Sequence, residues 1–299
     1  MTGDRCFPRA LARVLILALC VAVLGGCSLV RIGYNYLDTI AVWTADDYFD
    51  LDSDQRRAFA TRFDPLHAWH RYEQLPDYAA FLTATRARME KGLTREDFLW
   101  IVDGMSERYR TLMRRSADDV AALLLTVTPE QLNVMQRQLD KDNRRFIREY
   151  QLEESVEEQR RASARRALVR IRDWAGSLTH EQEQQIATLA SEVPWTHRMR
   201  HEDRLRRQRE FLQLMQQRDN PREFTARLRH WLVNFEEGRN PEYHQAFVTW
   251  TQKQGDYLAG VDRILTASQR ASVLNRLQGY IDDFTRLAQR PATRAAASR

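Results

Sequence analysis

Two histidines have the spacing most suggestive of chemistry. His197 and His201 are four residues apart on a predicted helix, and that spacing binds zinc when a third ligand converges on the pair. No glutamate follows His197 in the arrangement of a metalloprotease, and Arg198, Arg200 and Arg204 would repel a cation. The pattern therefore favours structural or solvent-facing histidines and predicts no zinc centre.

A group of aspartates near residue 46 offers a second candidate. Asp38, Asp46, Asp47 and Asp50 place four carboxylates in a short span. A loop for a hard cation needs convergent oxygen ligands and a glycine turn, and the sequence shows neither. We expect no metal here.

A second pair of histidines, His67 and His70, lies within one helical turn beside Phe63 and Trp69. These neighbours favour a packed aromatic face over a ligand pair.

Signatures of catalysis are missing as well. The chain has no Gly-x-Ser-x-Gly phrase, no glycine-rich phosphate loop and no zinc-ligand signature. We therefore predict a protein that is not an enzyme and needs no cofactor. An envelope hydrolase with scattered catalytic residues stays open as one hypothesis.

The N-terminus indicates the compartment. A positively charged region precedes an apolar run, Leu15 to Leu24, that is too short to span a bilayer as a helix. The run ends in Leu24-Gly25-Gly26-Cys27, which resembles the cleavage box of bacterial lipoproteins. That resemblance implies a signal peptide over residues 1–26 and acylation of Cys27. The other two cysteines, Cys6 and Cys20, fall in the segment removed, so no thiol or disulfide is expected in the mature chain.

Ser28 bears on which membrane is reached. It is not the aspartate that, in lipoproteins of this kind, retains the protein at the inner membrane. The resemblance therefore implies the periplasmic face of the outer membrane, with the bilayer as a partner through the lipid on Cys27. We expect no nucleic acid as a partner, despite an isoelectric point near 9.3 and a net charge of +5. Only three of the 46 basic residues are lysines, which fits either carboxylate and phosphate recognition or the base composition of the genome.

A repeated phrase predicts the elements that carry these residues. It consists of an apolar residue, a threonine or aspartate, two further residues, and a glutamine or aspartate, and each copy opens an amphipathic run. Such a phrase is a capping box, in which the first polar side chain binds the N3 amide and the side chain at N3 returns to the N-cap amide. Five copies begin at Leu51, Leu93, Val127, Leu178 and Leu265.

Two resemblances follow from these motifs. The phrase is similar to the Leu-Thr-x-x-Gln motif of the small helical periplasmic chaperones of the Spy/CpxP type, although independent evolution of good helix caps would give the same pattern. The stretch from Tyr34 to Leu51, with its Tyr-Asn, Leu-Asp, Trp and Tyr-Phe-Asp-Leu steps, resembles a family of uncharacterised proteobacterial lipoproteins. Neither resemblance implies a catalytic site.

The predicted fold is all-α: an elongated multi-helix array of capped amphipathic helices with one long central helix. No glycine or proline occurs from Glu130 to Ala175, which would give a helix on the order of 70 Å long. Its middle, Glu153 to Arg166, is almost wholly charged and includes a supportive pair, Glu157 and Arg161. We place a boundary there, giving an N-terminal helical region (27–152), a C-terminal helical region (153–290) and a disordered tail (291–299).

Three functions remain. The first is an outer-membrane lipoprotein that binds polypeptide in the manner of a chaperone, because amphipathic helices rimmed by charge suit adaptable contacts. The second is a non-enzymatic structural adaptor in a cell-envelope complex. The third is the hydrolase already mentioned.

Overall fold

A computed structural model describes residues 29–289 as helices and short connections, with no strand in that range. The all-α fold class is confirmed. Cys27, the predicted signal peptide and the predicted tail lie outside the described residues. The helices are α2 (Leu29–Asn35), α3 (Leu37–Phe49), α4 (Ser53–Trp69), the π-helix η1 (His70–Gln74), α5 (Leu75–Glu90), α6 (Arg95–Leu124), α7 (Pro129–Glu149), α8 (Val156–Ala175), α9 (His180–Ser191), α10 (His197–Gln216), α11 (Pro221–Val233), α12 (Pro241–Ile264) and α13 (Ala267–Ala288).

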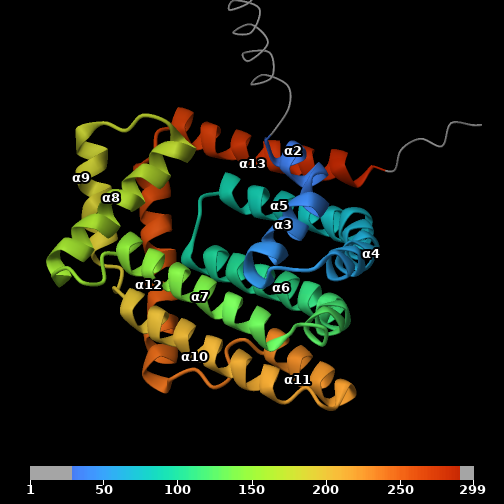
Figure 1. The fold of residues 1–299 in the computed structure, drawn as a ribbon. Helices are drawn as coiled ribbons and strands as arrows, with labels where there is room; N and C mark the ends of the chain where they lie inside the picture. The colour runs from blue at the N-terminus through green and yellow to red at the C-terminus, as the bar shows by residue number, and fades with distance from the viewer. Residues whose placement is uncertain (1–28, 290–299) are drawn as a thin grey trace, which may run out of the picture.

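The helices form a broad array and not an elongated one (Figure 1). α13 packs on α5, α5 on α6 and α6 on α11, while α12 packs against α6 and α9. Helices from both sides of the proposed boundary are therefore in contact, and the boundary itself stays a prediction. Within residues 29–289, no helix combines the length and apolar character that crossing a bilayer requires.

All five copies of the repeated phrase form the capping boxes expected of them, at the starts of α4, α6, α7, α9 and α13. A sixth box, made by Ser155 and Glu158, opens α8. Its Ser-x-x-Glu spacing was visible in the sequence.

The glutamines of the boxes also join helices in pairs. In the N-terminal glutamine pair, Gln55 and Gln131, each side-chain amide donates to the other's carbonyl oxygen, at 3.0 and 2.6 Å. Gln55 also donates to the Thr126 carbonyl and Gln131 to the Asp50 carbonyl. The starts of α4 and α7 are thereby bound to one another.

The C-terminal glutamine pair, Gln182 and Gln269, repeats this geometry at the starts of α9 and α13. The reciprocal amide bonds measure 2.8 and 3.1 Å. Gln182 also donates to the Ile264 carbonyl and Gln269 to the Ser177 carbonyl. One phrase thus caps a helix and docks it to another, over a sequence separation of 76 residues in the first pair and 87 in the second.

The predicted long central helix is wrong, because the chain turns between α7 and α8. Gln151 adopts a left-handed φ of 52°, and Leu152 is buried. Side chains bind the carbonyls that the break releases: Arg166 binds that of Glu149, Arg198 that of Leu152, and Gln159 that of Glu154. These bonds come from distant or later residues and satisfy the groups that a helix end exposes, so tertiary contacts override the local helix preference.

Two clusters of buried side chains form the core. Cluster 1 is centred on Phe224, Leu228, Met215 and Val127. Cluster 2 is centred on Ile186, Tyr257 and Val261. In cluster 2, α12 approaches α9 closely at Gly260, where a Cβ atom would lie 2.6 Å from Leu189.

A candidate ligand-binding cleft

A cleft of about 880 Å³ opens between α8 and α12. α8 packs against α9 and α13, whereas α12 packs against α6 and α9, and residues of both α8 and α12 line the cleft. The volume lies toward the upper end of the range on the order of 300–1,000 Å³ that is usual for ligand sites. Apolar and aromatic residues dominate its lining: Leu82, Met89, Leu93, Phe98, Ile101, Ala167, Ile171, Trp174, Val193, Pro194, Trp195, Trp250, Tyr257, Leu258, Val261, Leu265, Val273, Leu274 and Leu277.

Part of the lining carries positive charge. Four arginines of α8, together with Arg200 of α10, line it: Arg160, Arg161, Arg166 and Arg170. Within residues 29–289, none of these five guanidinium groups has a carboxylate oxygen within the 4.0 Å of an ion pair. The expected pair between Glu157 and Arg161 does not form. We refer to the five residues as the arginine rim.

His197 lies within this positive field. Its pKa is lowered to about 4, first by burial and then by the charges of Arg166, Arg200 and Arg170. The imidazole is therefore neutral at physiological pH, and its Nδ1 has no hydrogen-bond partner in the described chain. The rim is therefore a cluster of positive charge in which no guanidinium is ion-paired within the described residues.

Three more polar atoms in the lining lack partners among the described residues: the Tyr257 hydroxyl, the Trp195 indole nitrogen and Nη2 of Arg166. Burial raises the pKa of Tyr257 to about 12, so the hydroxyl keeps its proton and can donate. Buried donors without partners cost free energy, and a ligand that accepts from them would recover part of it.

Another charged part of the lining is neutralised internally. Asp262 pairs with Arg270 at 3.0 Å and accepts from the Leu93 amide at 3.0 Å. Arg270 also donates to the Met89 carbonyl. Asp262 and Arg270 therefore neutralise one another, unlike the five arginines of the rim.

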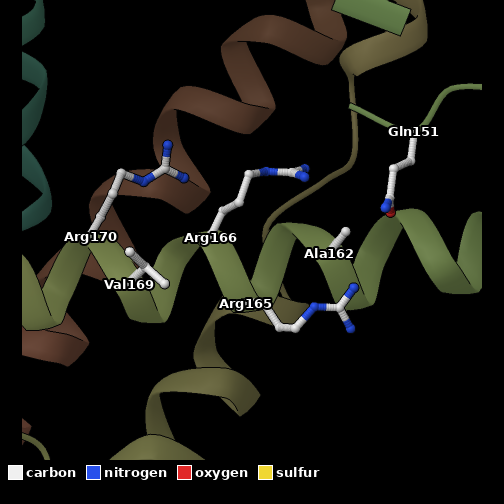
Figure 2. A pocket seen from close by; sticks show the side chains of 6 residues that line it. All are labelled: Gln151, Ala162, Arg165, Arg166, Val169 and Arg170. Carbon is white, nitrogen blue, oxygen red and sulfur yellow. The ribbon is translucent and has the colours of Figure 1, made fainter. Parts of the chain in front are cut away.

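A shallower groove of about 410 Å³ adjoins the rim and shares Arg166 and Arg170 with it. Figure 2 shows these two side chains extending from the same side of α8, while Arg165 points elsewhere and Gln151 reaches toward the helix from the preceding turn. The groove extends the positive surface beyond the cleft itself.

Of the histidines and aspartates weighed as ligands in the sequence, only His197 lines the cleft within the described residues. His201 stacks on Phe146 at 5.6 Å and His197 packs on Tyr150 at 4.4 Å, so they are structural histidines. His70 binds the Tyr34 hydroxyl at 2.8 Å, and Phe63 packs against His67. Asp46 accepts from the Leu51 amide. Over residues 29–289, no three His, Cys, Asp or Glu side chains are grouped to hold a metal ion.

Sequence reasoning missed the cleft itself. Its walls come from helices that span residues 82 to 277, and no local pattern brings these together. One signal was present in the rim: Arg160, Arg166 and Arg170 have no acidic residue four positions away on α8, so no intrahelical pair of that spacing can neutralise them.

Comparison with known proteins gives a family and no activity. A model described as a family of unknown function (DUF6279) matches residues 47–244, which is more than half of the chain. The chain therefore belongs to this family. No curated protein and no solved structure matched the chain.

Proposed function

We propose that this member of the DUF6279 family is a lipid-anchored envelope protein that binds polypeptide in the cleft between α8 and α12 and performs no chemistry. Acylated Cys27 would hold it at the periplasmic face of the outer membrane. The observation that carries the proposal is the pairing of a large apolar cleft with an arginine rim that forms no ion pair among the described residues.

The lining suits an extended segment. Aromatic side chains such as Trp195, Trp250 and Phe98 supply large contact areas, and aromatic residues and arginine are the types enriched where proteins meet. The arginine rim adds selectivity, because guanidinium groups bind carboxylates with paired hydrogen bonds. We therefore expect clients in which apolar residues stand beside aspartate or glutamate.

A binding titration tests the cleft. Two fluorescent peptides share the same apolar residues, but one carries glutamates and the other lysines at the flanking positions. The soluble chain from Ser28 onward should bind the acidic peptide, and the Arg166→Gln/Arg170→Gln variant should bind it about tenfold more weakly, or about 1.4 kcal/mol. Added salt should weaken the wild-type complex more than that of the variant.

A matched control comes from α7. Arg144 and Arg148 are also four residues apart, exposed and without an ion pair in the part of the chain described, and they do not line the cleft. The Arg144→Gln/Arg148→Gln variant should bind like the wild type. If both double variants bound the acidic peptide equally weakly, the rim would act only through nonspecific charge.

Other outcomes would overturn the proposal. Binding of a long-chain fatty acid with no binding of either peptide would assign the cleft to lipid. Purification with one stoichiometric partner, bound away from the cleft, would favour the adaptor. The anchor is tested separately, by mass spectrometry of the mature N-terminus, where an unmodified first residue would refute it.

A further inference from the structure

The segment that follows Cys27 leaves several large apolar side chains exposed. A surface helix normally turns its apolar stripe toward the core. In α2 and α3, Phe49 packs against cluster 1 and the Tyr34 ring packs against His67 and His70, but four other large apolar side chains are left exposed. Four of the ten large apolar side chains that the described residues expose lie in this short segment; the other six are divided among α6, α8 and α12.

The inward contacts are specific. Arg31 forms an ion pair at 2.9 Å with Asp283, which is buried in α13. Asn35 accepts from Arg71 at 2.9 Å, and the Tyr34 hydroxyl meets His70 at 2.8 Å. Further along, the Tyr48 hydroxyl donates to Asp142 of α7. These bonds fix the orientation of α2 and α3 on the body.

The outward face consists of Ile32, Tyr36, Ile40 and Trp43, which we call the outer stripe. Tyr36, Ile40 and Trp43 follow one another at helical spacing and are 63%, 42% and 66% exposed. Contiguous exposed apolar residues mark a contact surface. Tyrosine and tryptophan are the residues enriched where proteins meet the interface of a bilayer.

The position of the stripe in the chain selects its occupant. Leu29, the first residue of α2, comes two residues after Cys27, so the chain between them spans no more than about 7 Å. The polar layer on each side of a bilayer is only about 5–8 Å thick. A lipid on Cys27 would therefore bring α2 into the headgroup layer, while the carboxylates Asp46, Asp47 and Asp50 lie at the far end of α3.

We infer that the outer stripe is a membrane-contact surface, which lies in the headgroup region and holds the body at a fixed orientation to the bilayer. This inference rests on the lipid anchor of the proposed function and not on the cleft. It gives the anchor a second point of attachment, and two attachments hold a protein to a membrane more stably than one.

Site-directed labelling tests it, and the sequence is suited to the method because Cys6, Cys20 and Cys27 are its only cysteines. Nitroxides are placed on the lipidated protein in phosphatidylcholine vesicles through Tyr36→Cys, Ile40→Cys or Trp43→Cys. These labels should collide more with oxygen than with a water-soluble nickel chelate. A label through Asp38→Cys, an exposed position on the opposite face of α3, should show the reverse. Equal nickel accessibility at all four positions would overturn the inference.

A tethered form separates this result from the lipid on Cys27. The chain from Ser28 is given an N-terminal hexahistidine tag and a polarity-sensitive dye at the same positions. The tag binds vesicles that contain nickel-chelating lipids. A blue shift at residues 36, 40 and 43 on adding vesicles supports the stripe even if Cys27 proves unmodified. No shift would overturn it. A shift that grows with protein concentration in the absence of vesicles would assign the stripe to a second copy of the chain instead.

Discussion

The two glutamine pairs have the same bonding pattern but lie over different interiors. Gln55 and Gln131 are both buried, whereas in the C-terminal pair Gln182 is buried and Gln269 is partly exposed. The N-terminal pair adjoins cluster 1, to which Val127 and Leu132 of the capping phrase contribute. The C-terminal pair adjoins cluster 2, to which Leu178 and Leu265 contribute.

The second interior contains the cleft. Tyr257, Val261 and Leu265 belong to cluster 2 and also line the cavity, while no member of cluster 1 lines it. The capping phrase therefore fixes the relative positions of two helix starts. It does not determine whether side chains fill the interior next to those helices. In the C-terminal region the same device holds helices around an opening, which is where we place the function.

The largest expected effect is on the buried pair. Gln131→Ala removes the bond to the Thr128 amide and the bond to the Asp50 carbonyl, and it leaves Gln55 without its partner. Each unsatisfied buried group costs about 1–3 kcal/mol, so we expect a loss of about 3 kcal/mol in the free energy of unfolding. Gln269→Ala should cost only about 1.5 kcal/mol, because water can replace part of what is lost.

Urea unfolding followed by circular dichroism measures both variants. Gln245→Ala is the control, since Gln245 is exposed and its side chain has no bond to the rest of the described chain; it should stay within about 0.5 kcal/mol of the wild type. Equal losses for Gln131→Ala and Gln269→Ala would show that burial does not distinguish the pairs.

The caps themselves should be alike in both regions. Thr128 accepts from the Gln131 amide at 3.3 Å and Thr266 from the Gln269 amide at 3.2 Å. Thr128→Ala and Thr266→Ala should each cost about 1 kcal/mol, as the loss of a cap does. An unchanged unfolding midpoint for either variant would contradict this, and a much larger cost at Thr128 would mean that the cap and the pair are coupled.

This contrast shows what could be predicted from the sequence. A capping box joins residues three positions apart, so the starts of α4, α6, α7, α9 and α13 could be predicted from the phrase alone. The break between α7 and α8 could not, because Arg198 and the buried Leu152 stabilise it through tertiary contacts.

The candidate site was still less accessible to sequence reasoning. The arginines of α8 were visible as a charged block, but such a block more often marks a solvated face. Only the packing of α12 and α13 beside α8 makes Arg166 and Arg170 part of a cleft. The pairing of the glutamines was likewise hidden, because each partner is supplied by a remote copy of the phrase.

The comparison also predicts a functional difference. If the C-terminal pair holds the helices around the cleft, Gln182→Ala should weaken binding of the acidic peptide by about two- to fivefold, or about 0.5–1 kcal/mol. Gln55→Ala should leave the affinity unchanged at a temperature where the variant is fully folded. Fluorescence anisotropy at equal folded fractions measures both, and equal affinities would show that the pair has no influence on the cleft.

The smallest effect concerns the copy of the phrase in which an aspartate replaces the glutamine. The side chain of Asp97 has no amide group and cannot donate a hydrogen bond. Its carboxylate accepts from the Thr94 backbone amide at 3.2 Å and from Arg88 at 2.8 Å. Burial would raise the pKa of Asp97, but the hydrogen bonds from Arg88 and Thr94 outweigh it and hold this pKa below its usual 3.8. In this copy the charged carboxylate of Asp97, bound by Arg88, takes the place of the glutamine that is bound by a second glutamine in the paired copies.

This exchange makes the copy of the phrase that begins at Leu93 sensitive to pH. Because the folded pKa of Asp97 lies below the unfolded value, its ionised form stabilises the fold above about pH 5, and this contribution is lost as the pH falls through 3.8 and then through the folded pKa. We expect Asp97→Asn to cost about 0.5 kcal/mol at pH 6, a modest value because Arg88 is partly exposed, and to cost progressively less toward pH 3.5. Urea unfolding of both proteins across this range measures the difference, with Asp103→Asn, an exposed position without an ion pair in the described residues, as the control. A difference that stays constant with pH would mean that Asp97 acts only as a neutral cap, and the contrast between glutamine and aspartate copies would then be one of shape and not of charge.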